Sequence, residues 1–304
     1  MVGFEGQAEI GKLNLAGVTL DEADMDFIAY WRQRLPHDFN EKDERARIYL
    51  GFELNGINRG QAALKRLEGY FTVRDKIVLD VGSGNGGQCI AAALAGAKKV
   101  YGLELDPVRI DLAKKWAECR GVEIFVERGV AEKLPYEDAS IDIVFSFSVI
   151  EHVTSHDKML AEIGRVLRPG GYAVIEGPNR LSPKLFLADP HYQIMAVSAL
   201  PRPIAKWWVL KVKKIAYDYG VGVFPIYSLL IRKLRRYGFD LITSEHHDYR
   251  IERLEHPDAI RSRMRYLVKL LAWMRLNKAL ATVLRNTSPI FEILVQKSSS
   301  PLLK

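Results

Sequence analysis

The chain has 304 residues, of which 48% are hydrophobic, which suffices for one large domain with insertions or for two small domains with a well-buried core. This composition excludes a disordered tail, and the presence of only two cysteines, Cys89 and Cys119, excludes a disulfide-rich miniprotein. The first residues lack the basic-then-apolar pattern of a signal peptide, and no stretch approaches about 18 uninterrupted apolar residues. We therefore expect a soluble protein of a reducing cytoplasm.

Basic residues are concentrated in the C-terminal third. The formal net charge is +7, yet the residues from 200 onward contain 20 basic and only 8 acidic side chains. Because these lysines and arginines are interleaved with aromatic residues, they suit an anionic partner such as a membrane surface, a nucleic acid or a phosphorylated substrate. A merely solvated basic face explains the same pattern equally well.

Residues 1–75 are predicted to form N-terminal helices that cover the core. Thr19, followed three residues later by Glu22, is a capping-box pattern, and apolar residues then recur at helical spacing until Pro36. A second helix is expected over residues 57–70. Both helices precede the first strand, so they could either pad a sheet or close over a ligand.

Residues 76–178 alternate between short apolar runs and helical segments, as in a parallel sheet covered by helices. The expected helices begin near residues 88, 107 and 155. The expected strands span 77–81, 100–103, 122–126, 141–147 and 172–176. This alternation predicts an α/β core.

The remaining sequence contains two insertions. Residues 179–227 lose the regular alternation, and irregular segments of that length in a compact domain are more often functional than accidental. We expect them to form a lid over the acceptor. Residues 228–304 should return to the core with a helix and two strands, interrupted by a basic helical insertion at 251–287.

A glycine-rich turn directly follows the first expected strand. Gly82, Gly84 and Gly87 would let backbone N–H groups and a helix N-terminus approach a ligand, which fits both a dinucleotide and another nucleoside. Asp80 helps to choose between them. Its carboxylate would repel a pyrophosphate but attract the ammonium and sulfonium groups of S-adenosylmethionine.

Six segments of the chain, in the same order and spacing, resemble the class I S-adenosylmethionine-dependent methyltransferases, especially the type-11 branch that includes ubiquinone and menaquinone methyltransferases. The segments are 78–86, 100–107, 131–136, 141–144, 149–153 and 167–171. The resemblance implies a Rossmann-like, doubly wound sheet of seven strands, mostly parallel with the last strand antiparallel. It also implies S-adenosylmethionine as the cofactor.

The resemblance also implies roles for individual residues. The residues expected along the methionine part and the tight turn are Asp80, Gly82, Gly84 and Gly86, and those expected around the ribose and adenine are Glu104, Leu105, Ala131 and Glu132. The backbone of Phe147 would face the methionine end. Val130 stands where many relatives have an aspartate for the adenine amino group, so adenine recognition would depend on the backbone or on Glu132.

The expected chemistry is methyl transfer, which needs a general base only if the acceptor must lose a proton. His191, within the lid, is our candidate for this base, and His152 is a second candidate. In the bacterial ubiquinone O-methyltransferases a second glutamate precedes the pair equivalent to Glu151 and His152, and that cluster can hold a divalent ion. Ser148 occupies this place here, so we expect no metal site.

Three functions are considered. The first is O-methylation of a small or lipid-linked acceptor, such as a quinone or prenyl precursor or a surface glycan precursor. The second is an RNA or protein methyltransferase that uses the basic C-terminal third, but no Asn-Pro-Pro-Tyr motif follows the fourth strand and no RNA-binding module is appended, which disfavours a nucleic acid. The third is a non-catalytic S-adenosylmethionine-binding subunit. The sequence does not determine the oligomeric state.

Two stretches combine aromatic or apolar residues with lysines and arginines. One contains Trp207 and Trp208 among several lysines, and the other is the helical face from Met264 to Met274. Such stretches can lie on anionic lipid, so we expect peripheral association with the cytoplasmic membrane face. Internal packing and dimerisation are the alternatives.

Overall fold

The computed structural model describes residues 20–39, 44–189, 191–192, 194–213, 220–245 and 277–299. Thr19 and the helical face from Met264 to Met274 lie outside the described residues. The chain divides into two compact units. The first unit comprises residues 1–145 with 165–172, and the second comprises 146–164 with 173–304.

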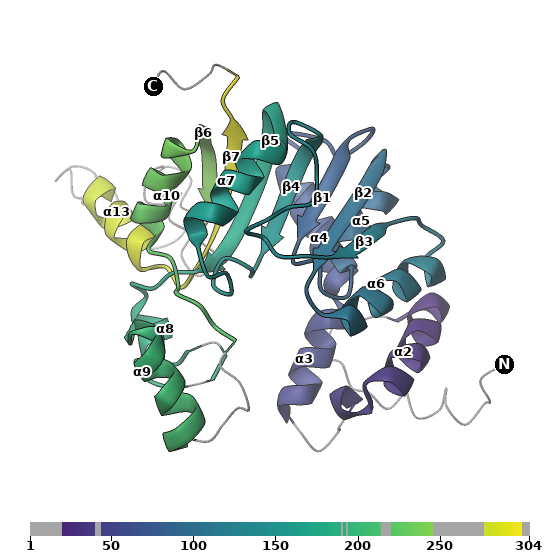
Figure 1. Cartoon of the computed structure of the whole chain (residues 1–304), viewed down its shortest axis with the longest axis horizontal. Helices are drawn as coiled ribbons and strands as arrows, with labels where there is room; N and C mark the ends of the chain where they lie inside the picture. Colours follow the sequence, from purple (N-terminus) through teal and green to yellow (C-terminus); the bar gives the residue numbers. More distant parts are fainter. Residues whose placement is uncertain are drawn as a thin grey trace, which may run out of the picture. The chain divides into compact units, whose positions relative to one another are not determined.

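A seven-stranded sheet runs through the structure in the order β3-β2-β1-β4-β5-β7-β6 (Figure 1). The strands are β1 (Ile77–Val81), β2 (Lys99–Glu104), β3 (Phe125–Arg128), β4 (Ile141–Phe147), β5 (Leu167–Pro178), β6 (Phe239–Glu245) and β7 (Ile290–Lys297). β1 pairs in parallel with β2 and β4, whereas β7 is antiparallel to β6. These pairings confirm the predicted Rossmann-like α/β fold.

The order of the strands fixes where a ligand would bind. The chain runs from β1 outward through β2 to β3 and then returns to the other side of β1 with β4. In open sheets of this kind, ligands bind beyond the carboxyl ends of the strands at the point where the order reverses. The glycine-rich turn that follows β1 occupies this place.

The helices of the first unit differ in part from those expected. They are α2 (Glu22–Arg34), η1 (Pro36–Phe39), α3 (Glu44–Leu54), α4 (Gly56–Leu67), α5 (Gly87–Leu94) and α6 (Pro107–Cys119). The prediction of a Thr19–Glu22 capping box was wrong, because Asp21 caps α2 and shares reciprocal hydrogen bonds with Asp24. The sequence pattern also missed α3.

Two close helix contacts hold the N-terminal helices to the core of the first unit. A Cβ atom at Gly60 of α4 would lie 2.6 Å from the Cβ of Ala91 in α5, so only a glycine allows this approach. On α2, Phe27 stacks on Trp116 of α6 with ring centroids 4.6 Å apart. These contacts attach α2 and α4 to the helices that flank the glycine-rich turn.

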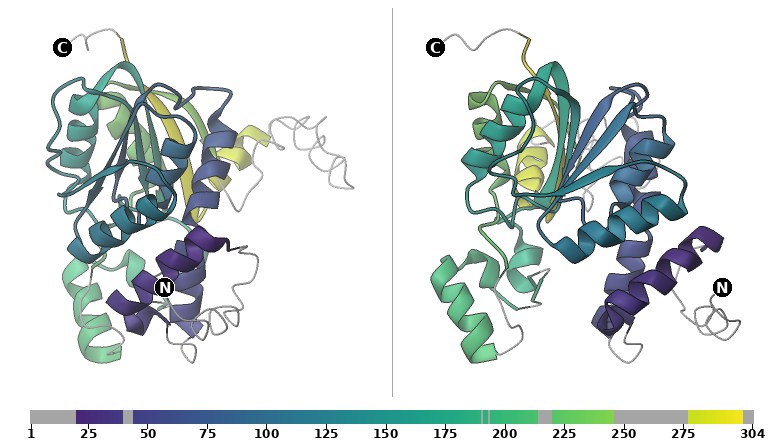
Figure 2. Two further views of the ribbon diagram at one scale, coloured as in Figure 1. Left: turned by 90° about the vertical axis from the view of Figure 1, so that its right-hand side faces the viewer. Right: turned by 45° about the vertical axis from the view of Figure 1, so that its right-hand side comes forward.

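The second unit contains α7 (His156–Val166), α10 (Tyr227–Arg236), α13 (Asn277–Thr287) and the segment from 179 to 213, here called the cap. The cap consists of short helices: α8 (Pro183–Leu187), η2 (Val197–Ala199), α9 (Arg202–Trp207) and the π-helix η3 (Trp208–Lys213). Figures 1 and 2 show α9 continuing directly into η3. The cap has its own apolar cluster, which includes Leu185, Val197 and Val209 and is joined by Phe224.

Candidate active site

The glycine-rich turn after β1 adopts backbone conformations that favour glycine. Gly82, Gly84 and Gly86 have φ angles of 73°, 53° and 84°. A Cβ atom at Gly86 would also lie 2.9 Å from the Cβ of Ala113. The turn is therefore specified by its three glycines, and α5 begins immediately after it at Gly87.

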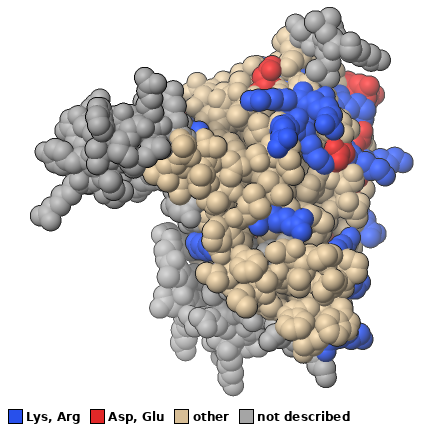
Figure 3. Space-filling view, turned by 90° about the vertical axis from the view of Figure 1, so that its left-hand side faces the viewer, with Lys and Arg blue, Asp and Glu red and all other residues tan. Residues whose placement is uncertain are grey.

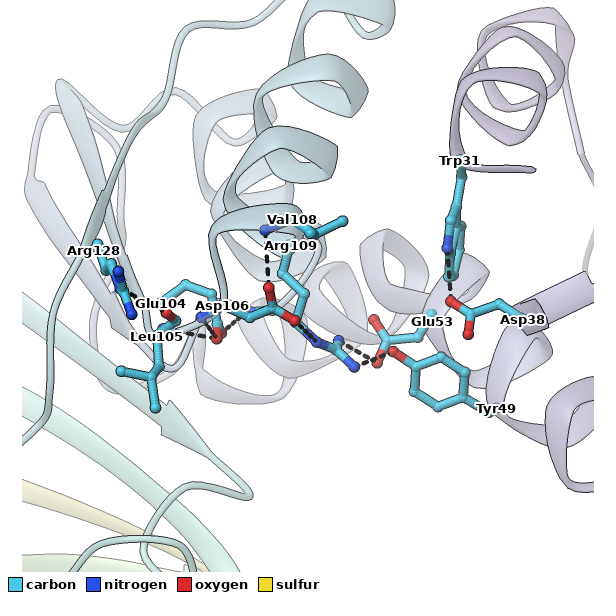
Figure 4. Close-up of polar contacts among 11 residues, drawn as sticks. Trp31, Asp38, Tyr49, Glu53, Glu104, Leu105, Asp106, Val108, Arg109 and Arg128 are labelled. Carbon is cyan, nitrogen blue, oxygen red and sulfur yellow. Dashed lines mark hydrogen bonds and ion pairs between the residues drawn. The ribbon is translucent and has the colours of Figure 1, made fainter. Parts of the chain in front are cut away.

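Glu104, at the end of β2, fastens this turn. Its carboxylate accepts a hydrogen bond from the backbone N–H group of Gly84 at 2.9 Å. It also accepts from the backbone N–H groups of Leu105 at 2.8 Å and Asp106 at 3.0 Å (Figure 4). A carboxylate offers about four lone-pair sites, so roughly one is left for a ligand. To accept from two ribose hydroxyls, as the resemblance implies, Glu104 would have to release one of these backbone groups.

Asp80 is buried beneath the turn. Only 3% of the residue is exposed, and the Sγ atom of Cys89 lies 3.7 Å from its Oδ2 atom. Burial, with a smaller contribution from Glu104, raises the pKa of Asp80 to about 8. A cationic ligand beside this carboxyl group would favour its ionised form.

Two further side chains of the turn are buried without a hydrogen-bond partner. Among the described residues, nothing bonds to the hydroxyl of Ser83 or to either polar atom of the Asn85 side chain. Buried polar groups are normally paired, so such unpaired groups mark a place for a ligand or for water. The turn therefore fits a polar nucleoside-containing molecule such as S-adenosylmethionine.

The other expected cofactor residues differ in their surroundings. In the first unit, Leu105 is 58% exposed beyond Glu104, which leaves its side chain free for a contact, whereas Ala131 is buried and Glu132 is half-buried. Val130 is exposed. Phe147 ends β4 and belongs to the second unit. The roles of these residues toward adenine and methionine stay predictions.

A polar cluster beside Glu104 was missed by the sequence analysis. Arg109 of α6 donates a hydrogen bond to the hydroxyl of Tyr49 and forms ion pairs with Glu53 at 3.6 Å and Asp106 at 4.0 Å (Figure 4). Burial raises the pKa values of Tyr49 and Glu53. Tyr49 and Glu53 belong to α3, a helix that the periodicity did not reveal, so no signal pointed to this cluster.

In the second unit, Glu151 is a buried carboxyl group with an unpaired oxygen. The residue is 3% exposed, and its Oε2 atom has no hydrogen-bond partner among the described residues. Burial, with a smaller contribution from Glu176, raises the pKa of Glu151 to about 8. At neutral pH this side chain is therefore largely a neutral acid.

His152 and His191 lie together in the second unit. Their rings meet edge to face with centroids 5.1 Å apart, and the His191 ring is 5.9 Å from that of Phe224. The Nδ1 atom of His152 is 3.1 Å from the carbonyl oxygen of Gly220, which favours a proton on Nδ1 and leaves Nε2 as an acceptor. Both candidate bases thus share one site.

Burial lowers the pKa of His191 to about 4, and the neighbouring His152 contributes in the same direction. His191 is therefore neutral at pH 7. Its loop is shaped by Asp189, whose carboxylate accepts from the backbone N–H groups of His191 and Tyr192, each at 2.9 Å. This carboxylate thus fixes the backbone that carries His191.

Glu151, His152 and His191 could also hold a metal ion. Their potential ligand atoms all lie within 4.8 Å of one another. The third potential ligand, His191, lies about forty residues beyond Glu151 in the chain, so the sequence around Glu151 gives no sign of it. A protonated Glu151 needs no cation, so the geometry is compatible with either an acid–base cluster or a metal site.

Comparison with known proteins identifies relatives of this chain. A family model described as a methyltransferase domain matches residues 79–175. The chain is 31% identical over 180 residues to a demethylmenaquinone methyltransferase of Chlorobaculum tepidum, a match that covers 58% of this chain and 69% of that protein. It is 36% identical over 112 residues to a ubiquinone biosynthesis O-methyltransferase of Maricaulis maris, covering 36% of this chain and 44% of that protein.

Further relatives are matched over different shares of their length. The chain spans about half the length of several other curated relatives, 55% in the case of a probable S-adenosylmethionine-dependent methyltransferase of Mycolicibacterium smegmatis. A solved S-adenosylmethionine-dependent methyltransferase from Mesorhizobium loti has a TM-score of 0.51 at 19% identity. That match covers 77% of this chain and 96% of the solved one. It supports the fold.

Proposed function

Because the chain belongs to the S-adenosylmethionine-dependent methyltransferases, we propose that it methylates a hydroxyl oxygen of a small or lipid-linked acceptor, such as a quinone or prenyl precursor or a surface glycan precursor. S-adenosylmethionine, when bound, supplies an electrophilic methyl group. The contribution of this chain is to hold that cofactor, to orient the acceptor and to remove the hydroxyl proton.

The glycine-rich turn supports the cofactor half of the proposal. The carboxylate of Glu104 is held by three backbone N–H groups and keeps about one lone-pair site for a ribose hydroxyl. The Asp80 carboxyl group would be stabilised in its charged form by the ammonium and sulfonium groups of the cofactor. The unpaired polar atoms of Ser83 and Asn85 offer further hydrogen bonds.

The single observation that carries the acceptor half is the placement of the His191 and His152 imidazoles edge to face, with ring centroids 5.1 Å apart and the Phe224 ring beside His191. A hydroxyl acceptor must lose a proton, and only an unprotonated nitrogen can receive it. His191 has a lowered pKa, so this form predominates at pH 7. We propose His191 as the base, with His152 beside it as the second acceptor of the proton.

The surroundings of His191 favour an apolar or lipid-linked acceptor over a nucleic acid. The aromatic rings of Tyr192 and Phe224 flank the His191 ring, and both residues belong to or pack against the apolar cluster of the cap. The Maricaulis maris relative is named for O-methylation in ubiquinone biosynthesis, which supports the same class. We further propose a cytoplasmic location, since both cysteines are free thiols.

The proposal is tested by incubating the purified protein with S-adenosylmethionine that carries a labelled methyl group. Label should appear in the organic phase with a membrane lipid extract or with quinol and prenylated phenol analogues. It should not appear with RNA or protein. Label in RNA or protein would favour the second hypothesis, and binding of S-adenosylhomocysteine without transfer to any acceptor class would favour a non-catalytic subunit.

A further inference from the structure

The outer surface of the cap exposes many large apolar side chains. Seven large apolar side chains of the cap are between 44% and 65% exposed: Leu181, Phe186, Leu187, Met195, Ile204, Trp207 and Val212. Single exposed apolar residues need no explanation, but several on one small module mark an interaction site. None of the helices in the described residues is both long and apolar enough to cross a bilayer.

The helix formed by α9 and η3 separates an inner from an outer face. Ala205 and Val209 are fully buried in the apolar cluster of the cap, whereas Ile204 and Trp207 are about half exposed. Ile204, Trp207 and Lys211 follow the spacing that places residues on one side of a helix. Trp208, which the sequence analysis grouped with Trp207, is partly buried and packs against the inner cluster.

The charge of the cap is almost entirely positive. Residues 180–213 contain six lysines and arginines and a single acidic residue, Asp189, which is only 1% exposed. Arg202, Lys206 and Lys211 are exposed around the apolar side chains of α9 and η3. In Figure 3 the cap, at the bottom, shows tan and blue side chains and, among the described residues in view, no red ones.

We propose that the outer face of the cap, centred on Ile204 and Trp207, docks onto the surface of an anionic lipid bilayer. An amphipathic helix with basic residues around aromatic and aliphatic side chains lies in the bilayer interface. It binds through the burial of its apolar side chains and through the attraction of its basic side chains to anionic lipid. The cap exposes basic side chains but no acidic ones, so its charge is complementary to that of an anionic lipid surface. The inference deepens the proposed function, since a lipid-linked acceptor would be met at such a surface.

The test is cosedimentation of the full chain with vesicles of phosphatidylcholine alone or of phosphatidylcholine with 30% phosphatidylglycerol. The protein should pellet with the anionic vesicles only, and pelleting should fall as salt is raised. Lys206→Glu with Lys211→Glu should weaken the partition coefficient by at least about 25-fold, since each surface lysine contributes about fivefold. Trp207→Ala should weaken it by about tenfold.

Matched controls lie in the first unit. Lys65→Glu with Lys114→Glu makes the same change in net charge at two exposed lysines of α4 and α6, and Leu94→Ser removes a side chain as exposed as that of Ile204. Both controls should pellet like the wild type. Equal loss in the lysine control, equal pelleting with neutral vesicles or no pelleting at all would overturn the proposal.

Gel filtration tests the remaining alternative, in which the apolar surface of the cap forms a dimer interface. A dimer that Trp207→Ala converts to a monomer would assign the surface to a second copy of this chain and overturn the lipid interpretation. Binding of S-adenosylhomocysteine and labelled methyl transfer to a water-soluble acceptor analogue are measured on the same variants. Because no cofactor residue is changed, loss of vesicle binding with retained transfer is distinguishable from failure of the proposed function.

Discussion

The turn after β1 and the cluster around Glu151 both bury acidic and polar side chains, but they stabilise them differently. The carboxylate of Glu104 accepts from three backbone N–H groups, two in the residues that directly follow β2 and one in the glycine-rich turn. Glu151 has an unpaired oxygen and a raised pKa, and its neighbour His191 comes from a segment about forty residues away. Local backbone thus preorganises the turn that we propose to hold the cofactor, whereas tertiary packing assembles the cluster that we propose to act on the acceptor.

Mutations in the two regions should therefore change different quantities, cofactor affinity in the turn and turnover in the cluster around Glu151. The largest effect is expected in that cluster. His191→Ala should lower turnover by at least about 100-fold, because a positioned general base contributes on the order of 100-fold to 10,000-fold. The affinity for S-adenosylhomocysteine, measured by calorimetry, should stay within about twofold of the wild type. Tyr192→Phe is the matched control and should keep most of the activity. Unchanged turnover in His191→Ala would leave the histidine a packing role in the cap.

A slightly smaller effect is expected at Glu104, where the mutation should weaken cofactor binding instead of lowering turnover alone. Glu104→Ala should weaken binding of S-adenosylhomocysteine by about 30-fold to 100-fold, because it removes a charge-assisted hydrogen bond and frees the turn that the carboxylate holds. Glu118→Ala removes an exposed carboxylate paired with Lys115 and should bind like the wild type. Wild-type affinity in Glu104→Ala, measured in the same titration, would refute the role of Glu104 in the cofactor site.

The contrast between local backbone and tertiary packing also explains which features could be predicted from the sequence. The strands around Asp80 and Glu104 and the glycine-rich turn follow from short apolar runs and from glycines that must adopt positive φ angles, which are local signals. The predicted strand at 122–126 was displaced to Phe125–Arg128, since strand boundaries depend on pairing with β2. The proximity of His191 to Glu151 depends on how the cap folds back, and no local pattern encodes that.

Buried Asp80 makes the stability of the unliganded protein depend on pH. Its pKa is about 8 in the folded chain against 3.8 for a free side chain, so the associated stability is complete below about pH 4 and is lost as pH rises through 8. We expect the melting temperature of the wild type to fall by several degrees between pH 6 and pH 8.5. In Asp80→Asn this fall should be smaller.

The control for this prediction is Asp111→Asn, which changes an exposed aspartate paired with Arg34 and should follow the wild-type curve. Glu151 has a raised pKa of about 8 as well, so part of the slope should persist in Asp80→Asn and should fall further when Glu151→Gln is added. S-adenosylmethionine should protect the wild type more at pH 8.5 than at pH 6, since its positive charges favour ionised Asp80. A parallel pH dependence in wild type and Asp80→Asn would contradict the assignment.

The smallest effect should follow from metal removal, and its size decides how the second unit works. If Glu151 carries a proton at neutral pH, then Glu151, His152 and His191 need no cation and His191 is free to accept the proton of the acceptor. Treatment with EDTA followed by gel filtration should then change turnover by less than about twofold, and elemental analysis should find far less than one equivalent of zinc or another divalent metal. A divalent cation would instead bind both imidazoles, leave neither free as a base, and acidify a bound hydroxyl itself. Loss of turnover on chelation, restored by zinc in the wild type but not in Glu151→Gln, would therefore replace the base mechanism with a metal-assisted one while leaving the cofactor turn unaffected.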